Sequence, residues 1–184
     1  ACDATQAITA ANTLLNVGAV AVVGDTCSPA SEAAQPLYYA NGVAMVSPSS
    51  TMPNTTEQGY TTTFRVCSRE DTASALLATY LHDWLGVDRA TIVELSGFWG
   101  EPFATDTFSN TFTSLGGTVT SQRMVTSTAD YTNTLTAIQA ENPEVIFYAD
   151  DDANAAGLLS NMAHGLGMTA VSYTHLTLPT NREV

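Results

Sequence analysis

Short apolar runs alternate with amphipathic stretches along nearly the whole chain. The runs have the length and β-branched content of strands, and the stretches between them carry apolar residues at helical spacing. Such alternation predicts βαβ units and parallel sheets. We therefore expect an α/β fold. The expected strands are 19–23, 43–46, 61–66, 90–95, 118–125 and 145–148, the first two of them buried, and the expected helices are 3–16, 28–41, 71–85, 101–115, 131–140 and 152–165.

The alternation of expected strands and helices falls into two halves. A polar loop at 47–60 precedes the strand at 61–66, and the change from one half to the other lies near 65–72. We assign residues 1–68 to part of a first lobe and residues 69–171 to most of a second, with a cleft between the two. The helix at 71–85 is expected to carry one apolar side, made of Leu76, Leu77, Tyr80, Leu81 and Trp84.

The turn after the first strand is the main candidate for a binding site. A glycine at position 24 breaks the strand, Ser28 is a good helix N-cap, Pro29 suits the first helical position and Glu32 is expected in the first turn. A helix that begins at the carboxyl end of a strand can bind a carboxylate or a phosphate. The alternative is that Ser28 only caps its helix.

Composition excludes several partners. The 184 residues carry a net charge of −13, with 18 acidic residues against five basic ones, all of them arginine. This balance argues against nucleic acid and anionic membrane surfaces as partners, and it fits an exported or salt-adapted protein. No apolar run approaches the roughly 20 residues that a membrane helix needs.

The three cysteines divide unevenly. Neighbouring βα units could bring Cys2 and Cys27 together, and a bond between them would close a loop of about 26 residues and stabilise the fold by roughly 3 to 4 kcal/mol. Such a bond would imply an oxidising compartment. Cys67 lies in an apolar segment and is expected to be a buried thiol. The spacing of cysteines and histidines gives no support for a zinc site.

Five patterns, in order, carry a resemblance to a known family. They are Ala1-Cys2-Asp3 with Gln6-Ala7, Gly24-Asp25-Thr26-Cys27-Ser28, the stretch from Met45 to Pro53, Gly59-Tyr60 with Phe64-Arg65 and Asp71, and Tyr131-Thr132 with Leu135, Ile138 and Pro143 to Tyr148. Over residues 1–170 the chain resembles extracytoplasmic solute-binding proteins of the leucine/isoleucine/valine-binding type, the receptor subunits of amino-acid ABC transporters.

The resemblance implies a fold of two doubly wound parallel-sheet lobes, the type I periplasmic binding protein fold, that close over a ligand. It implies a disulfide between Cys2 and Cys27. By position, Ser28 would bind the α-carboxylate of the ligand. The loop residues Ser49, Ser50 and Thr51 would hold its carboxylate and ammonium groups through backbone and hydroxyl, and Trp99 would cover it from the second lobe.

One departure from the family bears on the ligand. Asp151 stands where the family usually places a tyrosine that touches the ligand, between Asp150 and Asp152. A carboxylate there would attract an ammonium group and repel a second carboxylate. The alternative is that these residues cap the following helix, which we favour for Asp152. We therefore expect a zwitterionic or cationic ligand of amino-acid type.

Both ends of the chain differ from the family pattern. The sequence starts without a signal peptide and without the strand and helix that the family carries before Cys2, so we expect a fragment that is incomplete at both ends. Residues 172–184 are similar to translated sequencing-adaptor remnants at the ends of metagenomic genes, and we expect them to be a non-native tail. The alternative is a genuine β-rich tail.

The expected function is that of an extracytoplasmic solute-binding subunit, periplasmic or extracellular, with lipid anchoring left open. Its partners would be an amino-acid-like ligand and ABC permease subunits, the protein would be monomeric, and no cofactor or metal is expected. The alternative is a ligand-sensing ectodomain or an amide-sensing regulator of the same fold. An enzyme using Asp25, Asp150 and Asp151 as metal ligands is disfavoured, because the chain has no lysine, glycine-rich phosphate loop or recognisable nucleophile and base pair.

Overall fold

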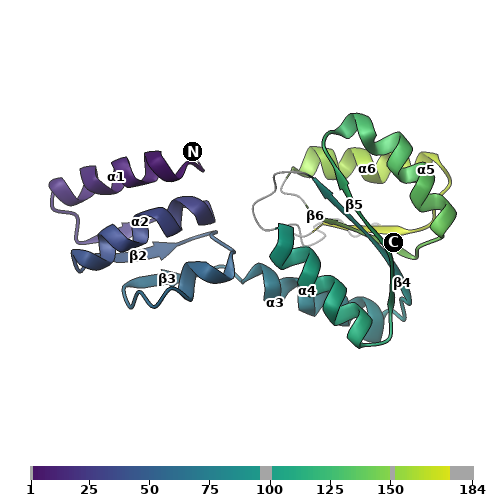
Figure 1. The fold of residues 1–184 in the computed structure, drawn as a ribbon, viewed down its shortest axis with the longest axis horizontal. Coiled ribbons are helices and arrows are strands. Elements are labelled where there is room, and N and C mark those ends of the chain that lie inside the picture. The colour runs from purple at the N-terminus through teal and green to yellow at the C-terminus, as the bar shows by residue number, and fades with distance from the viewer. Residues whose placement is uncertain (1, 96–100, 150–151, 175–184) are drawn as a thin grey trace. The chain divides into compact units, whose positions relative to one another are not determined.

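The computed structural model describes residues 2–95, 101–149 and 152–174, and it divides the chain into two compact units, Ala1–Glu70 and Asp71–Val184. Both units are built from parallel strands and helices in alternation (Figure 1). The α/β fold with parallel sheets that the sequence predicts is therefore confirmed. Within the described ranges no helix is both long and apolar enough to cross a lipid bilayer.

The first unit is a three-stranded parallel sheet in the order β1-β2-β3. Its elements are α1 (Ala4–Asn16), β1 (Ala21–Val23), α2 (Ser28–Ala40), β2 (Ala44–Ser47), a 3-10 turn (Pro53–Thr56) and β3 (Thr63–Arg65). Asp3 caps α1 by accepting the Gln6 N–H at 2.8 Å. The core of this unit joins both helices to the central strand, through Ala11, Ala34, Tyr38, Val43 and Met45.

The prediction of a buried first strand in this unit is wrong, and that of a buried second strand holds only for alternate residues. Val23 in β1 is 83% exposed, and β2 alternates between buried and half-buried residues. The buried residues of β2 and its neighbours meet α1 and α2 in a single core cluster. Because β1 pairs only with β2 among the described strands, it lies at an edge of that sheet. A β-branched run therefore stands here on a largely exposed edge strand.

The second unit is a four-stranded parallel sheet in the order β5-β4-β6-β7. Its elements are α3 (Glu70–Thr79, beginning at the last residue of the first unit), a π-helical turn (Tyr80–Trp84), β4 (Arg89–Leu95), α4 (Glu101–Ser114), β5 (Thr118–Val125), a 3-10 turn (Thr128–Asp130), α5 (Tyr131–Glu141), β6 (Val145–Ala149), α6 (Ala153–Gly165) and β7 (Val171–Thr174). In this unit, α5 and α6 lie on one side of the sheet and α3 and α4 on the other (Figure 1).

Strand β6 packs against helices on both faces of this sheet. All five of its residues are buried. Val145, Phe147 and Ala149 pack into the cluster shared with α3 and α4. Ile146 and Tyr148 pack into the cluster shared with α5 and α6. Successive side chains of a strand point to opposite faces, so a continuous apolar strand fits a doubly wound sheet.

The expected apolar side of the helix after residue 70 is only partly buried. Leu81 is buried and Leu77 packs against the same core, but Leu76 and Tyr80 are exposed and Trp84 is 79% exposed. The helix also widens into a π-helical turn at Tyr80–Trp84. Further along, residues 172–174, which the sequence places in a non-native tail, lie in β7 and pair with β6 in parallel. That residues 172–184 are a non-native tail stays a prediction.

Candidate functional site

The two pieces expected to form the site lie side by side in the first unit. Strands β1 and β2 are parallel neighbours, so the turn after β1 and the loop after β2 meet at one edge of the sheet. We call residues 25–28 and 47–52 the rim. The exposed Ser49 donates its hydroxyl to the carbonyl oxygen of Thr26 at 2.7 Å, which joins the two segments directly.

Ser28 does not cap its helix, contrary to the sequence prediction. Cys27 occupies the N-cap position with an extended backbone and makes no side-chain capping bond, and α2 begins at Ser28. Glu32 therefore falls outside the first turn. The hydroxyl of Ser28, a residue only 6% exposed, instead accepts the backbone N–H of Met52 at 3.2 Å. This side chain thus binds the neighbouring rim segment instead of its own helix.

Ser50 has its hydroxyl inside the protein. It is fully buried and lies 2.7 Å from the Ser31 hydroxyl and 2.8 Å from that of Ser47. The carbonyl oxygen of Asp25 is shared among these hydroxyls, at 2.6 Å from Ser47 and 3.2 Å from Ser50. The backbone N–H of Ser50 donates to Ser47 at 3.0 Å. The hydroxyls of this cluster hold the rim together, and the buried Ser50 uses its hydroxyl and its N–H in contacts within the protein.

Thr51 contacts an acidic residue at the end of the unit. Its hydroxyl donates to the Glu70 carboxylate at 2.9 Å, and the Glu70 N–H donates to the Thr51 carbonyl at 3.1 Å. Glu70 is 2% exposed, whereas Thr51 is half-buried. The rim thus places the half-buried Thr51 beside a buried carboxylate.

Arg65 supports the rim, a role that the sequence analysis did not predict. Its guanidinium donates to the carbonyl oxygens of Met52 at 2.7 Å and Ser50 at 3.2 Å, and to the Thr56 hydroxyl at 2.8 Å. An arginine at the end of β3, the next parallel strand, was the available signal, because that strand end meets the same edge.

The disulfide implied by the family is confirmed. Cys2 and Cys27 are bonded, with 5.3 Å between their Cα atoms, and so connect the start of α1 to the residue before Ser28. Cys67 is half-buried, contrary to the prediction of a buried thiol, and its sulfur lies 3.5 Å from the Ser50 carbonyl oxygen. Burial raises the pKa of the Cys67 thiol, and nearby Arg65 offsets only part of this rise. The raised pKa disfavours the reactive thiolate.

The expected contacts from the second unit lie outside the described residues. This holds for Trp99 and for Asp151, and equally for Asp150. Asp152 is described, and its carboxylate accepts the N–H groups of Asn154 at 2.8 Å and Ala155 at 3.2 Å. Its predicted role as the cap of α6 is therefore confirmed. In the described part of the chain no three His, Cys, Asp or Glu side chains gather as a metal site.

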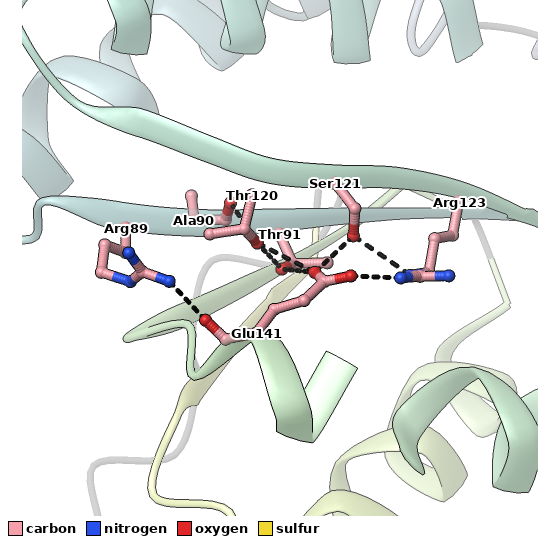
Figure 2. Close-up of polar contacts among 7 residues, drawn as sticks. All are labelled: Arg89, Ala90, Thr91, Thr120, Ser121, Arg123 and Glu141. Carbon is pink, nitrogen blue, oxygen red and sulfur yellow. Dashed lines mark hydrogen bonds and ion pairs between the residues drawn. The ribbon is translucent and has the colours of Figure 1, made fainter. Parts of the chain in front are cut away.

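A second polar cluster, which the sequence did not indicate, lies in the second unit around Glu141 at the end of α5 (Figure 2). One oxygen of this carboxylate accepts hydroxyl protons from Ser121 at 2.6 Å and Thr120 at 3.1 Å, and the other pairs with Arg123. Thr120 is the extra residue of a bulge, because Ala90 pairs with Val119 whereas the next residue pairs with Ser121. Glu141 thus binds the polar groups that this bulge presents.

The charge of Glu141 is favoured by its partners. Burial raises the pKa of the carboxyl, but hydrogen bonds from Ser121, Arg123 and Thr120 together outweigh burial and leave the pKa below its ordinary value. The cluster lies near the amino-terminal ends of β4 and β5, since Arg89 begins β4 and donates to the Glu141 carbonyl oxygen. We therefore interpret it as a structural cluster and the rim as the candidate binding site.

Comparison with known proteins gives consistent results. The chain matches the periplasmic binding protein family over residues 1–178. It is 28% identical to an amino acid binding protein of Pseudomonas aeruginosa over 92% of this chain and 46% of that protein, and 30% identical to the Leu/Ile/Val-binding protein BraC3 of Rhizobium johnstonii over 90% and 45%. The crystal structure of the leucine binding protein LivK from Thermotoga maritima matches with a TM-score of 0.78 and 27% identity, over 94% of this chain and 49% of that one. The chain thus spans about half the length of the relatives it matches.

Proposed function

The chain belongs to the periplasmic binding protein family, and from this premise we propose that it is part of the extracytoplasmic solute-binding subunit of an ABC transporter for a small zwitterion of amino-acid type. Its relatives include amino-acid and Leu/Ile/Val-binding proteins. The protein would bind its solute without converting it, act as a monomer and deliver the solute to permease subunits.

The observation that carries the proposal is the position of Ser28 beside the loop that contains Thr51. The Ser28 hydroxyl and the first turn of α2 lie at the carboxyl edge of a parallel sheet, where free N–H groups and the helix dipole favour a carboxylate. The half-buried Thr51 brings a second hydroxyl to the same rim. Two hydroxyls and a helix start at one edge suit the head group of an amino acid.

The finer parts of the proposal come from the family resemblance. The ligand would meet Ser28 and Thr51 first. Closure of the second lobe would then bring Trp99 and Asp151 to it. A carboxylate at Asp151 would favour a ligand with a positive group and disfavour a second carboxylate.

Titration calorimetry with the full-length protein tests this function. Leucine, isoleucine, valine, arginine and glutamate form the panel, and we expect the zwitterionic or cationic members to bind. Ser28→Ala should weaken binding by about 10-fold or more, since it removes a hydrogen bond to a charged group. Ser160→Ala, which alters an exposed serine of α6, is the matched control. Binding of glutamate alone would contradict the proposal.

A further inference from the structure

The contact between Thr51 and Glu70 determines which way the Thr51 hydroxyl points. A hydroxyl has one proton to donate and two lone pairs that accept, whereas an ionised carboxylate only accepts. In the contact of 2.9 Å the Thr51 hydroxyl is the donor and the Glu70 carboxyl oxygen the acceptor. Once that proton is committed, the oxygen of Thr51 has only lone pairs to offer to another group.

Ser28 shows the opposite arrangement on the same rim. Its oxygen accepts the N–H of Met52, so its own proton can still be donated. The rim therefore presents a hydroxyl donor at the start of α2 and a hydroxyl acceptor at Thr51. A donor suits a carboxylate and an acceptor suits an ammonium group, so the two hydroxyls complement the two charges of a zwitterion in a fixed order.

From this geometry we infer that Glu70 is a positioning residue, which makes Thr51 an acceptor and so gives the site its preference for an ammonium group over an uncharged substituent. The inference rests on the proposed function. A carboxylate that accepts the Thr51 proton also increases the negative charge on the Thr51 oxygen, and hydrogen bonds between an ammonium group and such an oxygen are charge-assisted. Glu70 itself does not touch the ligand.

Glu70 also has structural contacts, which the test must separate from this role. It is the first residue of α3, where a negative charge suits the helix dipole, and its N–H bonds to the Thr51 carbonyl. Loss of these contributions would lower stability and weaken all ligands alike. Loss of the positioning role would weaken a ligand that has an ammonium group more than a matched ligand that lacks one.

Two probes with one carbon skeleton make this distinction: L-leucine and L-2-hydroxy-4-methylpentanoate, which replaces the ammonium group by a hydroxyl. The measured quantity is the ratio of their Kd values in the full-length protein, determined by titration calorimetry. In Glu70→Met, which removes the acceptor but keeps the length of the side chain, the preference for leucine should fall by about tenfold, or about 1.4 kcal/mol. In Glu70→Gln, whose amide oxygen can still accept the Thr51 proton, the preference should fall less.

Each result bears on one claim. An unchanged ratio in Glu70→Met would overturn the inference and leave the proposed function standing, whereas failure of every member of the amino-acid panel to bind the wild-type protein would overturn both. If the preference for leucine falls equally in Glu70→Met and Glu70→Gln, the effect is due to charge alone. That result would contradict the positioning role. If Glu70→Met does not fold, Thr51→Val replaces it, and an unchanged ratio there would overturn the inference in the same way.

Discussion

Cys2 and Cys27 are bonded to each other, so that the start of α1 is attached to the residue that directly precedes Ser28. The hydroxyl of Ser28 in turn accepts the N–H of Met52 on the neighbouring loop. Both contacts act on the segment where β1 turns into α2. The disulfide thus stabilises a fold element and a candidate ligand contact together.

Removal of this disulfide should destabilise the protein. For Cys2→Ser with Cys27→Ser, the sequence separation of 25 predicts a loss of about 3 to 4 kcal/mol in unfolding free energy on the chain-entropy model. Urea denaturation measures the loss. Cys67→Ser is the control, because Cys67 is a free thiol. A double variant as stable as Cys67→Ser would show that the disulfide contributes little.

Ser50→Ala should cost stability because its hydroxyl is buried among polar partners. The change leaves the Ser31 and Ser47 hydroxyls with one partner fewer in the interior, which costs about 1 to 3 kcal/mol. The neighbouring Ser49 is exposed and makes one bond, so Ser49→Ala should change stability by less than about 0.5 kcal/mol. Equal effects of the two changes in urea denaturation would contradict the buried network.

The sequence predicted the rim but not the contacts within it. Helix start signals placed a helix near Ser28 at the carboxyl end of a strand, and the family resemblance implied that the loop of Thr51 joins it in the site. They could not show that Ser50 turns inward or that Arg65 reaches the carbonyl oxygen of Met52. Those contacts depend on the register of β3 and on side-chain conformation, which local patterns do not carry.

Burial was the other property that local patterns predicted poorly. The continuous apolar run of β6 was correctly interpreted as a strand, and it is buried on both faces. The similar run at β1 lies on an edge strand, where Val23 is 83% exposed. The cluster around Glu141 was missed because it depends on a register shift between β4 and β5, which only the paired strands reveal.

Glu141→Gln should destabilise the protein at neutral pH. The ionised carboxylate accepts hydrogen bonds from Thr120 and Ser121 and pairs with Arg123, and a neutral amide replaces these contacts poorly (Figure 2). We expect a loss of about 1 to 3 kcal/mol in urea denaturation at pH 7. Asp106→Asn, which removes the same charge from an exposed position of α4, is the matched control and should have almost no effect.

The effect of Glu141→Gln should also depend on pH. Partner hydrogen bonds hold the folded-state pKa of Glu141 below its ordinary value, after burial has raised it in part. A lowered pKa contributes stability that is fully present above the unfolded-state pKa of about 4.3 and is lost as the pH falls through the folded-state pKa. The difference in unfolding free energy between the wild type and Glu141→Gln should therefore become smaller at acidic pH. A gap independent of pH would exclude ionisation as the cause.

Glu32 should show the opposite pH dependence. Burial raises the pKa of this carboxyl, and the hydrogen bond from Thr55 at 3.4 Å lowers it only in part. A raised folded-state pKa means that folding favours the protonated form, so the stability present below the unfolded-state pKa is lost as the pH rises through the folded-state pKa. Glu32→Gln stays neutral and should be more stable than the wild type at pH 7, by less than about 1 kcal/mol because the side chain is partly exposed. The gain in stability should disappear below about pH 4.

Glu57→Gln, a change of the same type at an exposed carboxylate paired with Arg69, is the control and should give no gain in stability at pH 7. Urea denaturation at both pH values would distinguish the two carboxylates, since Glu32 and Glu141 then differ in the sign of their effect.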